Sequence, residues 1–430
     1  MERYSEYKDS GVQWIGEIPS HWDTRRVRYT GKSRNGLTYS PYDVNEDGEG
    51  TLVLRSSNIK EGKLTLDDNV FVKKEIPSDL MVKYGDILIC SRNGSRDLVG
   101  KLTLIDKDIK ASFGAFMMVY RTNMWAPFME NVLSVAIQSY KTLFSTSTIN
   151  QLTNDKFKNF VIPLPPLAEQ EKIVSYLKGK TSKIDAYVAE KEKEILLLQE
   201  LKQKTIADAV TKGLNPIVKM KDSGISWIGM IPEHWETKRI ASLFTGKVNA
   251  NSDFRYKHAF KFNYGTLVPK NEVGDAEEYR DVYVKYSVLQ EGDILINGLN
   301  LNYDFISQRV AIAPSDGIIT SAYVVARPRA GTNAHYYTYL FKTMDSMKLF
   351  HGMGTGIRLT LSFDELKKQL VIVPPQDEQC AIVAYIDEKC KKIDRLMTEL
   401  QAEIDYMKEY KQRLIADCVT GQVNVQNETI

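Results

Sequence analysis

The sequence has no long apolar run and few cysteines. No stretch approaches the roughly 18 to 20 apolar residues that a membrane span needs, and none follows the charged residues near the start of the chain. The four cysteines form no CxxC pair and stand near no set of histidines, which argues against a structural zinc site and against a secreted disulfide framework. We therefore expect a soluble chain in a reducing cytoplasm.

Patterns for catalysis are absent as well. The five histidines include no H-E-x-x-H pair, and no glycine-rich segment has the spacing of a P-loop. The PLPPL segment at 163–167 lacks the polar residue before Pro-Pro and the aromatic residue after it that amino-methyltransferases use on a flipped base. The glycine-rich stretch at 352–359 does not join a strand to a helix, so we interpret it as a loop. These absences argue against the common metal, nucleotide and methyltransferase sites in this chain.

Charge of one sign is not in excess. The chain has 57 Lys and Arg against 55 Asp and Glu, a formal net charge of +2. The whole-chain balance therefore does not indicate a nucleic-acid binder, and any basic surface must be local. A length of 430 residues exceeds what one hydrophobic core usually serves, which predicts two or three domains.

The sequence does contain a tandem duplication. Residues 8–22 read KDSGVQWIGEIPSHW and residues 221–235 read KDSGISWIGMIPEHW, with eleven of fifteen positions identical. Further shared segments keep nearly the same offset: YGDILI (84–89) and EGDILI (291–296), and IADAVT (206–211) and IADCVT (415–420). The repeating unit is therefore about half of the chain, which is too long for a solenoid repeat.

Each copy follows one order of segments. A WIG-x-IP-x-HW opening comes first, and its tryptophans are expected to pack onto the domain that follows. A body of short β-type runs separated by Gly, Asn and Asp turn signals comes next. A Pro-Pro stop and a long proline-free segment close the copy. We predict β-rich domains at 1–165 and 213–373, long helices at 166–212 and 374–422, and a tail at 423–430.

The closing segments carry the clearest secondary-structure signal. Steps of four and three residues along each segment give an apolar seam with the 3.5-residue period of a coiled coil. The seam residues are Leu177, Ile184, Val188, Ile195 and Leu198 in the first helix and Ile386, Ile393, Met397, Leu400, Ile404, Met407 and Leu414 in the second. Lys191, Lys202 and Lys411 interrupt the seam, either setting its register or reaching outward along their aliphatic stems. We predict an antiparallel coiled coil; the alternative is that each stripe covers only its own domain.

These segments together carry a family resemblance. The WIG-x-IP-x-HW opening, the GDILI strand, the PLPPLAEQEKIVSYL helix start and the IADAVT helix end, present twice in the same order, resemble the specificity subunit of type I restriction-modification enzymes. The resemblance implies an α+β fold of two tandem target-recognition domains, each followed by a long helix. It implies that each domain reads one half of a bipartite, asymmetric site in double-stranded DNA.

The same resemblance implies partners that carry the chemistry. Two methyltransferase subunits bind the helices and motor-nuclease subunits join the complex, with S-adenosylmethionine, ATP and Mg in those partners and none in this chain. The duplication leads to a compatible mechanism, because antiparallel helices relate the two bodies by an approximate twofold axis. Major-groove half-sites on one face of DNA recur about every 34 Å. A rigid helical spacer would therefore act as a ruler for the unread gap between the two half-sites.

Stretches that differ between the copies beside shared strands are candidate readers of bases, and a further candidate is LRSSN (54–58), whose polar residues follow an apolar strand. Arginine pairs bidentately with guanine and asparagine with adenine in the major groove, and these stretches contain both. The predicted DNA-binding residues of the first copy are Lys32, Arg34, Asn35, Arg55, Ser57, Asn58, Arg92, Asn93, Arg96 and Lys101, with Arg25, Arg26 and Arg28 on phosphates. Those of the second copy are Lys247, Asn249, Asn251, Asn297, Asn300, Asn302 and Arg309. For each residue alone, a turn or a solvated edge is an equally good interpretation.

Two other classes of function stay open. An intramolecular coiled-coil scaffold that organises proteins without DNA predicts no salt-dependent DNA affinity in the assembled complex. A catalytic DNA enzyme with unrecognised motifs predicts turnover by the purified chain that depends on a metal or a methyl donor. Because loop side chains do not map onto bases without a bound pose, the sequence assigns neither the bases read nor the spacer length.

Overall fold

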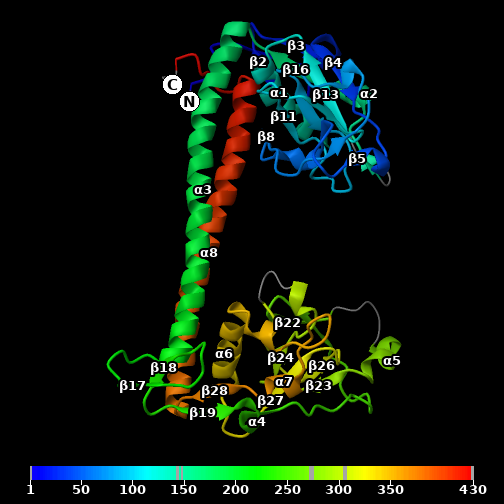
Figure 1. Cartoon of the computed structure of the whole chain (residues 1–430). Coiled ribbons are helices and arrows are strands. Elements are labelled where there is room, and N and C mark those ends of the chain that lie inside the picture. The colour runs from blue at the N-terminus through cyan, green and yellow to red at the C-terminus, as the bar shows by residue number, and fades with distance from the viewer. Residues whose placement is uncertain (1, 142–144, 147–148, 271–275, 304–307, 428–430) are drawn as a thin grey trace. The chain divides into compact units, whose positions relative to one another are not determined.

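The computed structural model describes residues 2–141, 145–146, 149–270, 276–303 and 308–427 (Figure 1). The chain divides into two compact units: unit 1 comprises residues 1–191 and 402–430, and unit 2 comprises residues 192–401. Each unit contains a body of short strands and one half of each of two long helices, α3 (Leu167–Lys212) and α8 (Gln376–Val419). The division thus crosses both helices, and the domain boundaries drawn from the sequence stay a prediction.

The body of unit 1 contains two four-stranded sheets. Its elements are β1 (Tyr7–Asp9), β2 (Glu17–Pro19), β3 (Asp23–Arg26), β4 (Gly31–Asn35), β5 (Val44–Asn45), β6 (Thr51–Leu54), β7 (Ile59–Lys60), β8 (Lys63–Leu64), β9 (Phe71–Val72), β10 (Ile87–Cys90), β11 (Leu102–Leu104), β12 (Ala111–Phe113), β13 (Met117–Thr122), α1 (Ala126–Ser139), β14 (Ser145–Thr146), β15 (Ile149–Asn150), α2 (Asn154–Phe157) and β16 (Val161–Leu164). One sheet has the antiparallel order β11-β10-β13-β4, and the other has the order β12-β6-β9-β5, in which β12 and β6 are parallel. Strand β10, whose sequence is ILIC, is buried at every position, as an uninterrupted apolar run predicts for a central strand.

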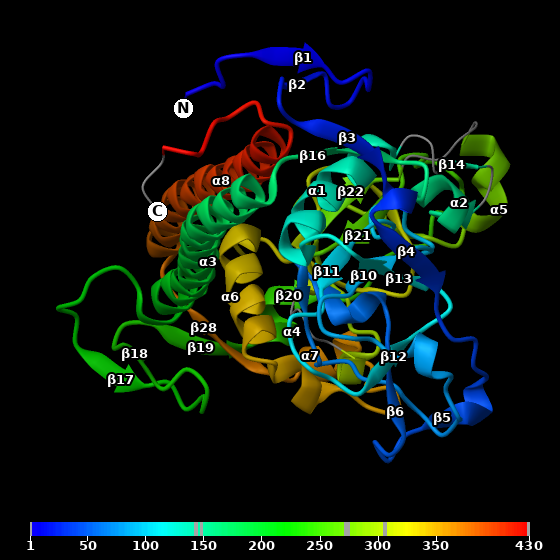
Figure 2. The same cartoon turned by 90° about the horizontal axis from the view of Figure 1, so that it is seen from above.

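The body of unit 2 repeats part of this plan. Its elements are β17 (Met220–Asp222), β18 (Met230–Pro232), β19 (Glu236–Arg239), α4 (Ile240–Leu243), β20 (Phe244–Thr245), β21 (Phe260–Asn263), β22 (Thr266–Pro269), α5 (Arg280–Tyr283), β23 (Ser287–Leu289), β24 (Ile294–Ile296), β25 (Val310–Ile312), β26 (Gly317–Ile319), β27 (Val324–Pro328), α6 (Ala334–Ser346), α7 (Phe363–Leu366) and β28 (Leu370–Val373). The antiparallel sheet β20-β27-β24-β25 corresponds to β4-β13-β10-β11 of unit 1. Helix α6 lies beside α3, where the Tyr336 hydroxyl donates to the Val210 carbonyl at 2.7 Å (Figures 1 and 2).

Each body is closed by pairing the strand that follows its opening segment with its last strand. In unit 1, β3 pairs antiparallel with β16, and α3 begins three residues after β16 ends. In unit 2, β19 pairs in the same way with β28, and α8 begins three residues after β28 ends. The opening segment and the start of the long helix are therefore brought together in both copies, although more than a hundred residues separate them in the sequence.

The long helices pair antiparallel within each unit. In unit 1, Lys411 Nζ lies 2.5 Å from Asp185 Oδ1, and the Tyr187 hydroxyl donates to Glu403 Oε2 at 2.9 Å. In unit 2, Lys202 Nζ lies 2.6 Å from Asp394 Oδ1. The predicted α+β fold with paired helices is confirmed. The twelve seam residues, from Leu177 to Leu414, are all buried or half-buried.

The lysines that interrupt the seam have defined roles. Lys202 and Lys411 each make an ion pair with an aspartate of the other helix. Lys191 Nζ lies 5.6 Å from the centroid of the Tyr187 ring, one turn earlier on its own helix. Lysines at 202 and 411 therefore favour one register of the pair, because a slip of one turn would separate each of them from its carboxylate.

The repeated GDILI segment contains a buried ion pair. Asp86 is 1% exposed, and its two carboxylate oxygens accept hydrogen bonds from Arg121 Nε and Nη2 at 2.7 and 2.6 Å. Asp293, also 1% exposed, accepts from Arg327 Nε and Nη2 at 2.9 and 2.7 Å. The aspartate directly precedes the strand β10 or β24, and the arginine lies one residue before the end of the neighbouring strand β13 or β27, so the pair holds these two strands together at one end. The motif is therefore structural in both copies.

The tryptophans of the repeated His-Trp pair, Trp22 and Trp235, contact the ends of α3 and α8. The Trp22 indole N–H donates to Glu169 Oε2 at 3.1 Å, and the Trp235 indole N–H donates to Glu378 Oε2 at 3.0 Å. Both rings are fully buried. Each ring also lies against the end of the other helix, since a Cβ built on Gly421 would stand 3.1 Å from Trp22. The opening segment thus joins the first turn of one helix to the last turn of its partner.

Candidate nucleic-acid interface

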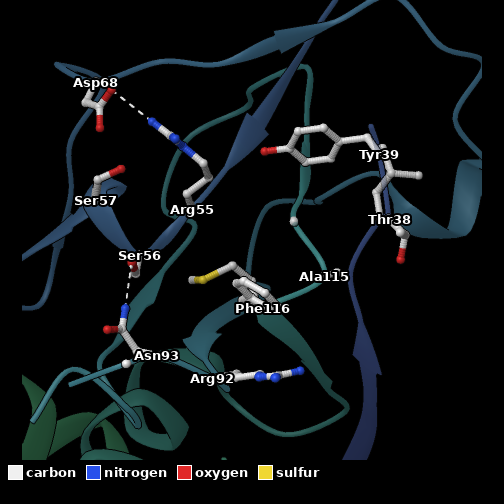
Figure 3. Close-up of a pocket in the computed structure, with 14 residues that line it drawn as sticks. Thr38, Tyr39, Arg55, Ser56, Ser57, Asp68, Arg92, Asn93, Ala115 and Phe116 are labelled. Atoms are coloured by element: carbon white, nitrogen blue, oxygen red, sulfur yellow. Dashed lines mark hydrogen bonds and ion pairs between the residues drawn. The ribbon is translucent and has the colours of Figure 1, made fainter. Parts of the chain in front are cut away.

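Unit 1 has an open hollow of about 930 Å³ where five separate segments converge (Figure 3). One loop follows each of β4, β6, β8 and β10, and the fifth segment is the turn between β12 and β13. The chain reversals at the ends of neighbouring strands bring these loops to one place. The side chains that matter below are Tyr39, Arg55, Ser56, Ser57, Asp68, Arg92, Asn93 and Phe116. The hollow contains four of the predicted DNA-binding residues, Arg55, Ser57, Arg92 and Asn93, from two distant stretches of sequence.

The loop after β6 is held by a buried asparagine. Asn58 is fully buried; its Oδ1 accepts from the Arg55 N–H, and its Nδ2 donates to the carbonyls of Thr65 and Asp68. Arg55 Nη2 in turn donates to Asp68 Oδ1 at 2.9 Å. The Arg55 charge is therefore already balanced within the loop, and Asn58 shapes the loop and offers no polar atom at the surface. Ser57 Oγ is buried without a hydrogen-bond partner in the described structure.

The loop after β10 carries Arg92 and Asn93 in different states. Asn93 uses both ends of its amide locally, since Oδ1 accepts from the Ser95 N–H at 3.0 Å and Nδ2 donates to Ser56 Oγ at 3.3 Å. The Arg92 guanidinium lies 5.1 Å from the centroid of the Phe116 ring. Among the residues that the structure describes, no carboxylate pairs with Arg92. Its five N–H donors are therefore open to a ligand in the hollow.

Phe116 forms the apolar part of the hollow. The ring is 59% exposed, which is unusual for so large an apolar side chain at a turn between strands. The Phe116 carbonyl accepts from the N–H groups of Ser91 and Arg92, so the turn and the loop after β10 hold one another. Cys90 lies beneath them, and burial raises the pKa of its thiol, which makes it a neutral packing group.

The other predicted residues of unit 1 lie outside the hollow. Arg25, Arg26 and Arg28 are exposed, and the first two line a shallow depression with Tyr29 and Val161. Arg34 makes an ion pair with Asp79. Lys32, Asn35 and Arg96 are exposed, and Lys101 is half-buried.

Unit 2 places its predicted residues in two environments. Lys247, Asn249, Asn300 and Asn302 are exposed, and Asn297 is half-buried with its Oδ1 accepting from the Leu299 N–H. Asn251 is fully buried and its amide bonds to the backbone of Tyr256 and Tyr283. Arg309 is 9% exposed and donates to the carbonyls of Asn297 and Leu299.

Asn58, Asn251 and Arg309 therefore differ from what their residue types predicted. Each satisfies backbone groups of a loop that would otherwise be buried without partners, which is a structural task. The loops they shape still carry the exposed predicted residues.

Aromatic residues of the hollow were missed by the sequence reasoning. Phe116 comes from a stretch that was not compared between the copies. Tyr39 lies in a compared stretch (31–40) but was not singled out. An exposed aromatic in the turn GAF between two strongly β-type runs is the signal that could have marked Phe116. The contact between Phe116 and Arg92 could not be predicted from local sequence, because it depends on the pairing of β10 with β13.

The described residues contain neither a metal-binding cluster nor a membrane-spanning helix. No group of three or more His, Cys, Asp or Glu side chains is arranged to hold a metal ion. None of the helices in the described ranges combines the length and the apolar character that crossing a membrane requires.

Comparisons with known proteins agree with one another. Residues 19–197 match the type I restriction modification DNA specificity domain family. The chain is 22% identical to the type I restriction enzyme EcoKI specificity subunit of Escherichia coli (strain K12), over 96% of this chain and 91% of that protein. It is 23% identical to the type I restriction enzyme StySPI specificity subunit of Salmonella potsdam, with the same two coverages.

The fold is also found among solved structures. A chain from structural work on complex assembly and conformational transition of the type I R-M system superposes with a TM-score of 0.65 at 16% identity. The match covers 94% of this chain and 99% of that one. At this identity the likeness concerns the fold alone, and it extends over both units and both long helices.

Proposed function

The chain belongs to the family of type I restriction-modification specificity subunits, and from this premise we propose that it selects the DNA sequence on which a type I complex acts. Unit 1 reads one half of a bipartite site and unit 2 reads the other. The paired helices fix the gap between the halves and dock methyltransferase subunits. The chain itself performs no chemistry.

One observation carries this proposal. Residues shared by the copies, such as Asp86 with Arg121 and Trp22 with Glu169, are buried and hold strands and helix ends together. Arg92, which differs between the copies, lies with Arg55 in a hollow that is open to solvent. A duplicated framework with divergent polar loops is what two different half-sites would require, because the framework positions the loops and the loops choose the bases.

The proposed contacts fall into two groups. Basic side chains away from the hollow, namely the exposed Arg25, Arg26, Arg28, Lys32, Arg96 and Lys247 and the half-buried Lys101, would contact phosphates and fix the position of the chain on DNA. Polar residues at the end of β4, namely Arg34 and Asn35, and on the loops, namely Arg55, Ser57, Arg92, Asn93, Asn249, Asn297, Asn300 and Asn302, are candidates for base edges or for holding the loops that reach them.

The partners follow from the same family membership. We expect two methyltransferase subunits and motor-nuclease subunits in the complex, with S-adenosylmethionine, ATP and Mg bound by those partners. The near-neutral charge of this chain fits an arrangement in which the partners supply much of the basic surface around the DNA. A cytoplasmic location is proposed, because the DNA to be modified and restricted is found there.

The test is a binding selection. This chain is purified in complex with a type I methyltransferase subunit from the same source and equilibrated with random duplex DNA at two salt concentrations. We expect the bound fraction to share two short sequence blocks separated by a constant gap, and affinity to fall as salt rises. The methyltransferase subunit alone is the control.

Other results of these experiments would contradict the proposed function. A stable complex that selects no sequence, or that binds DNA without dependence on salt, would contradict the proposal and favour a protein scaffold. Turnover by the purified chain with a metal or a methyl donor would contradict the non-catalytic assignment.

A further inference from the structure

The hollow of unit 1 contains two arginines, and only one of them has a free guanidinium. Arg55 is paired with Asp68 at 2.9 Å and its backbone is bonded to Asn58. Arg92 has no carboxylate partner in the described part of the chain and is held only by the ring of Phe116, at 5.1 Å. The difference matters because a paired arginine would have to break an ion pair before it could bind DNA.

The position of Arg92 is fixed from three sides. The backbone N–H of Arg92 donates to the Phe116 carbonyl at 3.1 Å. The side chain of the next residue, Asn93, forms hydrogen bonds with Ser56 and Ser95. The Phe116 ring then restricts the guanidinium through a cation–π contact. Rotamer freedom that a free arginine would lose on binding is thus partly removed beforehand, which favours specific contact.

We propose that Arg92 reads a guanine of the first half-site, donating two hydrogen bonds from its guanidinium to O6 and N7 in the major groove, with the Phe116 ring packed against the neighbouring base. This inference rests on the proposed function and names the residue that determines specificity in unit 1. Guanine is the base that presents two acceptors at the spacing of the guanidinium fork. An exposed phenyl ring beside it offers an apolar surface that suits a thymine methyl group.

The second unit lacks the pair of Arg92 and Phe116, so the inference applies to one half-site only. Ile89 on β10 pairs with Met118 on β13 in unit 1, and the corresponding pair in unit 2 is Ile296 on β24 with Val324 on β27. When the two units are aligned on these pairs, Leu299 and Ala322 occupy the positions of Arg92 and Phe116. Neither side chain can donate to a base. The guanine is therefore expected in one half-site only, at a position that the other half-site does not share.

The experiment is competition binding with the assembled complex of this chain and its methyltransferase subunit. Once the wild-type site is known, duplexes carry each of the four base pairs at every position of the first half-site. The variants are R92A, R92K and F116A. The matched control is R96A, an exposed arginine on the same loop that lies outside the hollow.

Wild-type protein is expected to prefer guanine at one position by a factor of about 5 to 100, the range for a bidentate pair. R92A and R92K lose this preference there and keep every other preference in both half-sites. R92K is informative because lysine keeps the charge but not the fork. F116A reduces the preference at the same or the neighbouring position. R96A weakens binding to all duplexes alike and lowers the salt slope by about one.

Three results would overturn the inference. In the first, R92A weakens binding to all duplexes equally, as R96A does, which would make Arg92 a phosphate contact. In the second, R92A and R92K both keep the wild-type preferences. In the third, the first half-site contains no guanine. A wild-type complex without any sequence preference would instead overturn the proposed function itself, and that result is obtained before any variant is made.

Discussion

Asp86 and Asp293 are buried carboxylates, and each is joined by two hydrogen bonds to an arginine on the next strand. Each also accepts from a backbone N–H, that of Lys83 or Gln290, at 2.8 Å. Every oxygen is therefore satisfied, which explains why the same aspartate stands in both copies while the loops beyond it differ. The role is to hold the sheet that carries the loops proposed to read DNA.

Removing one of these carboxylates should destabilise its unit. In D86N the Arg121 guanidinium loses its counter-charge, and we expect the free energy of unfolding to fall by about 3 kcal/mol, the low end for a buried pair, because 38% of the Arg121 side chain is exposed. Denaturant unfolding monitored by fluorescence measures the change. R395A, which breaks an exposed ion pair on α8, is the control and should change stability by less than about 1 kcal/mol. Equal effects of the two variants would contradict this account.

Glu130 gives unit 1 a dependence on pH. Burial raises the pKa of this carboxyl to about 7, although its Oε1 accepts from the Leu104 N–H at 2.8 Å. A folded-state pKa above the unfolded value means that the folded state binds the proton more tightly. The resulting stability is fully present below about pH 4.3, the unfolded value, and is lost as pH rises through about 7.

The variant E130Q should remove this dependence. Glutamine keeps an oxygen for the Leu104 N–H and cannot ionise, so we expect unfolding free energies close to wild type at pH 4 and higher than wild type at pH 8, by about 3 kcal/mol. Thermal unfolding of unit 1 across this pH range tests it. Parallel curves for wild type and E130Q would show that Glu130 does not titrate in this window.

Residue type alone could not separate readers from structural polar groups. Asn58, Asn251 and Arg309 matched the residue types for base contact, yet their hydrogen bonds point to the backbone of their own loops. Arg92 was predicted for the same reason. Among the described residues its guanidinium has no carboxylate partner, and it lies beside an exposed ring. The distinction depends on contacts between strands that are distant in sequence, which local patterns do not contain.

At the level of elements, the helices were the most predictable part of the molecule. A seam with a 3.5-residue period predicts both the helix and the face it buries, and the seam residues, including Ile386 and Ile404, are buried or half-buried. The helix starts at Leu167 and Gln376 follow the Pro-Pro stops directly. The short strands were less predictable, because the pairing of β3 with β16 and of β19 with β28 is set by the closure of each body.

The ruler role of the helices can be tested by insertion. Adding four residues to one helix lengthens it by about 6 Å and keeps the seam on nearly the same face, since 3.6 residues make one turn. The unread gap should then grow by about two base pairs at roughly 3.4 Å each. Mapping methylated sites of the variant in an active complex measures the gap. Adding two residues is the control, because this turns the seam away from its partner and should prevent assembly.

An unchanged gap with the four-residue insertion would contradict the ruler. It would indicate that the gap is set by the partner subunits or by flexible loops, and the proposed half-site roles of the two units would remain to be judged separately.

At the level of the whole chain, the duplication explains why one molecule has two similar units with different loops. The shared segments, among them the His-Trp openings and the GDILI strands, form the joints and sheets of both units. The divergent positions, such as Arg92 against Leu299, provide two unlike surfaces. A site read by such a chain is expected to have two different halves.

The most direct test of DNA recognition by this chain is a map of methylated adenines in a host genome. The host expresses a type I methyltransferase subunit from the same source, once with this chain and once without it. We predict one bipartite motif with unlike halves and a constant gap, present only when this chain is present. Methylation that is unchanged by its omission, or a stable complex that methylates no defined motif, would contradict the account.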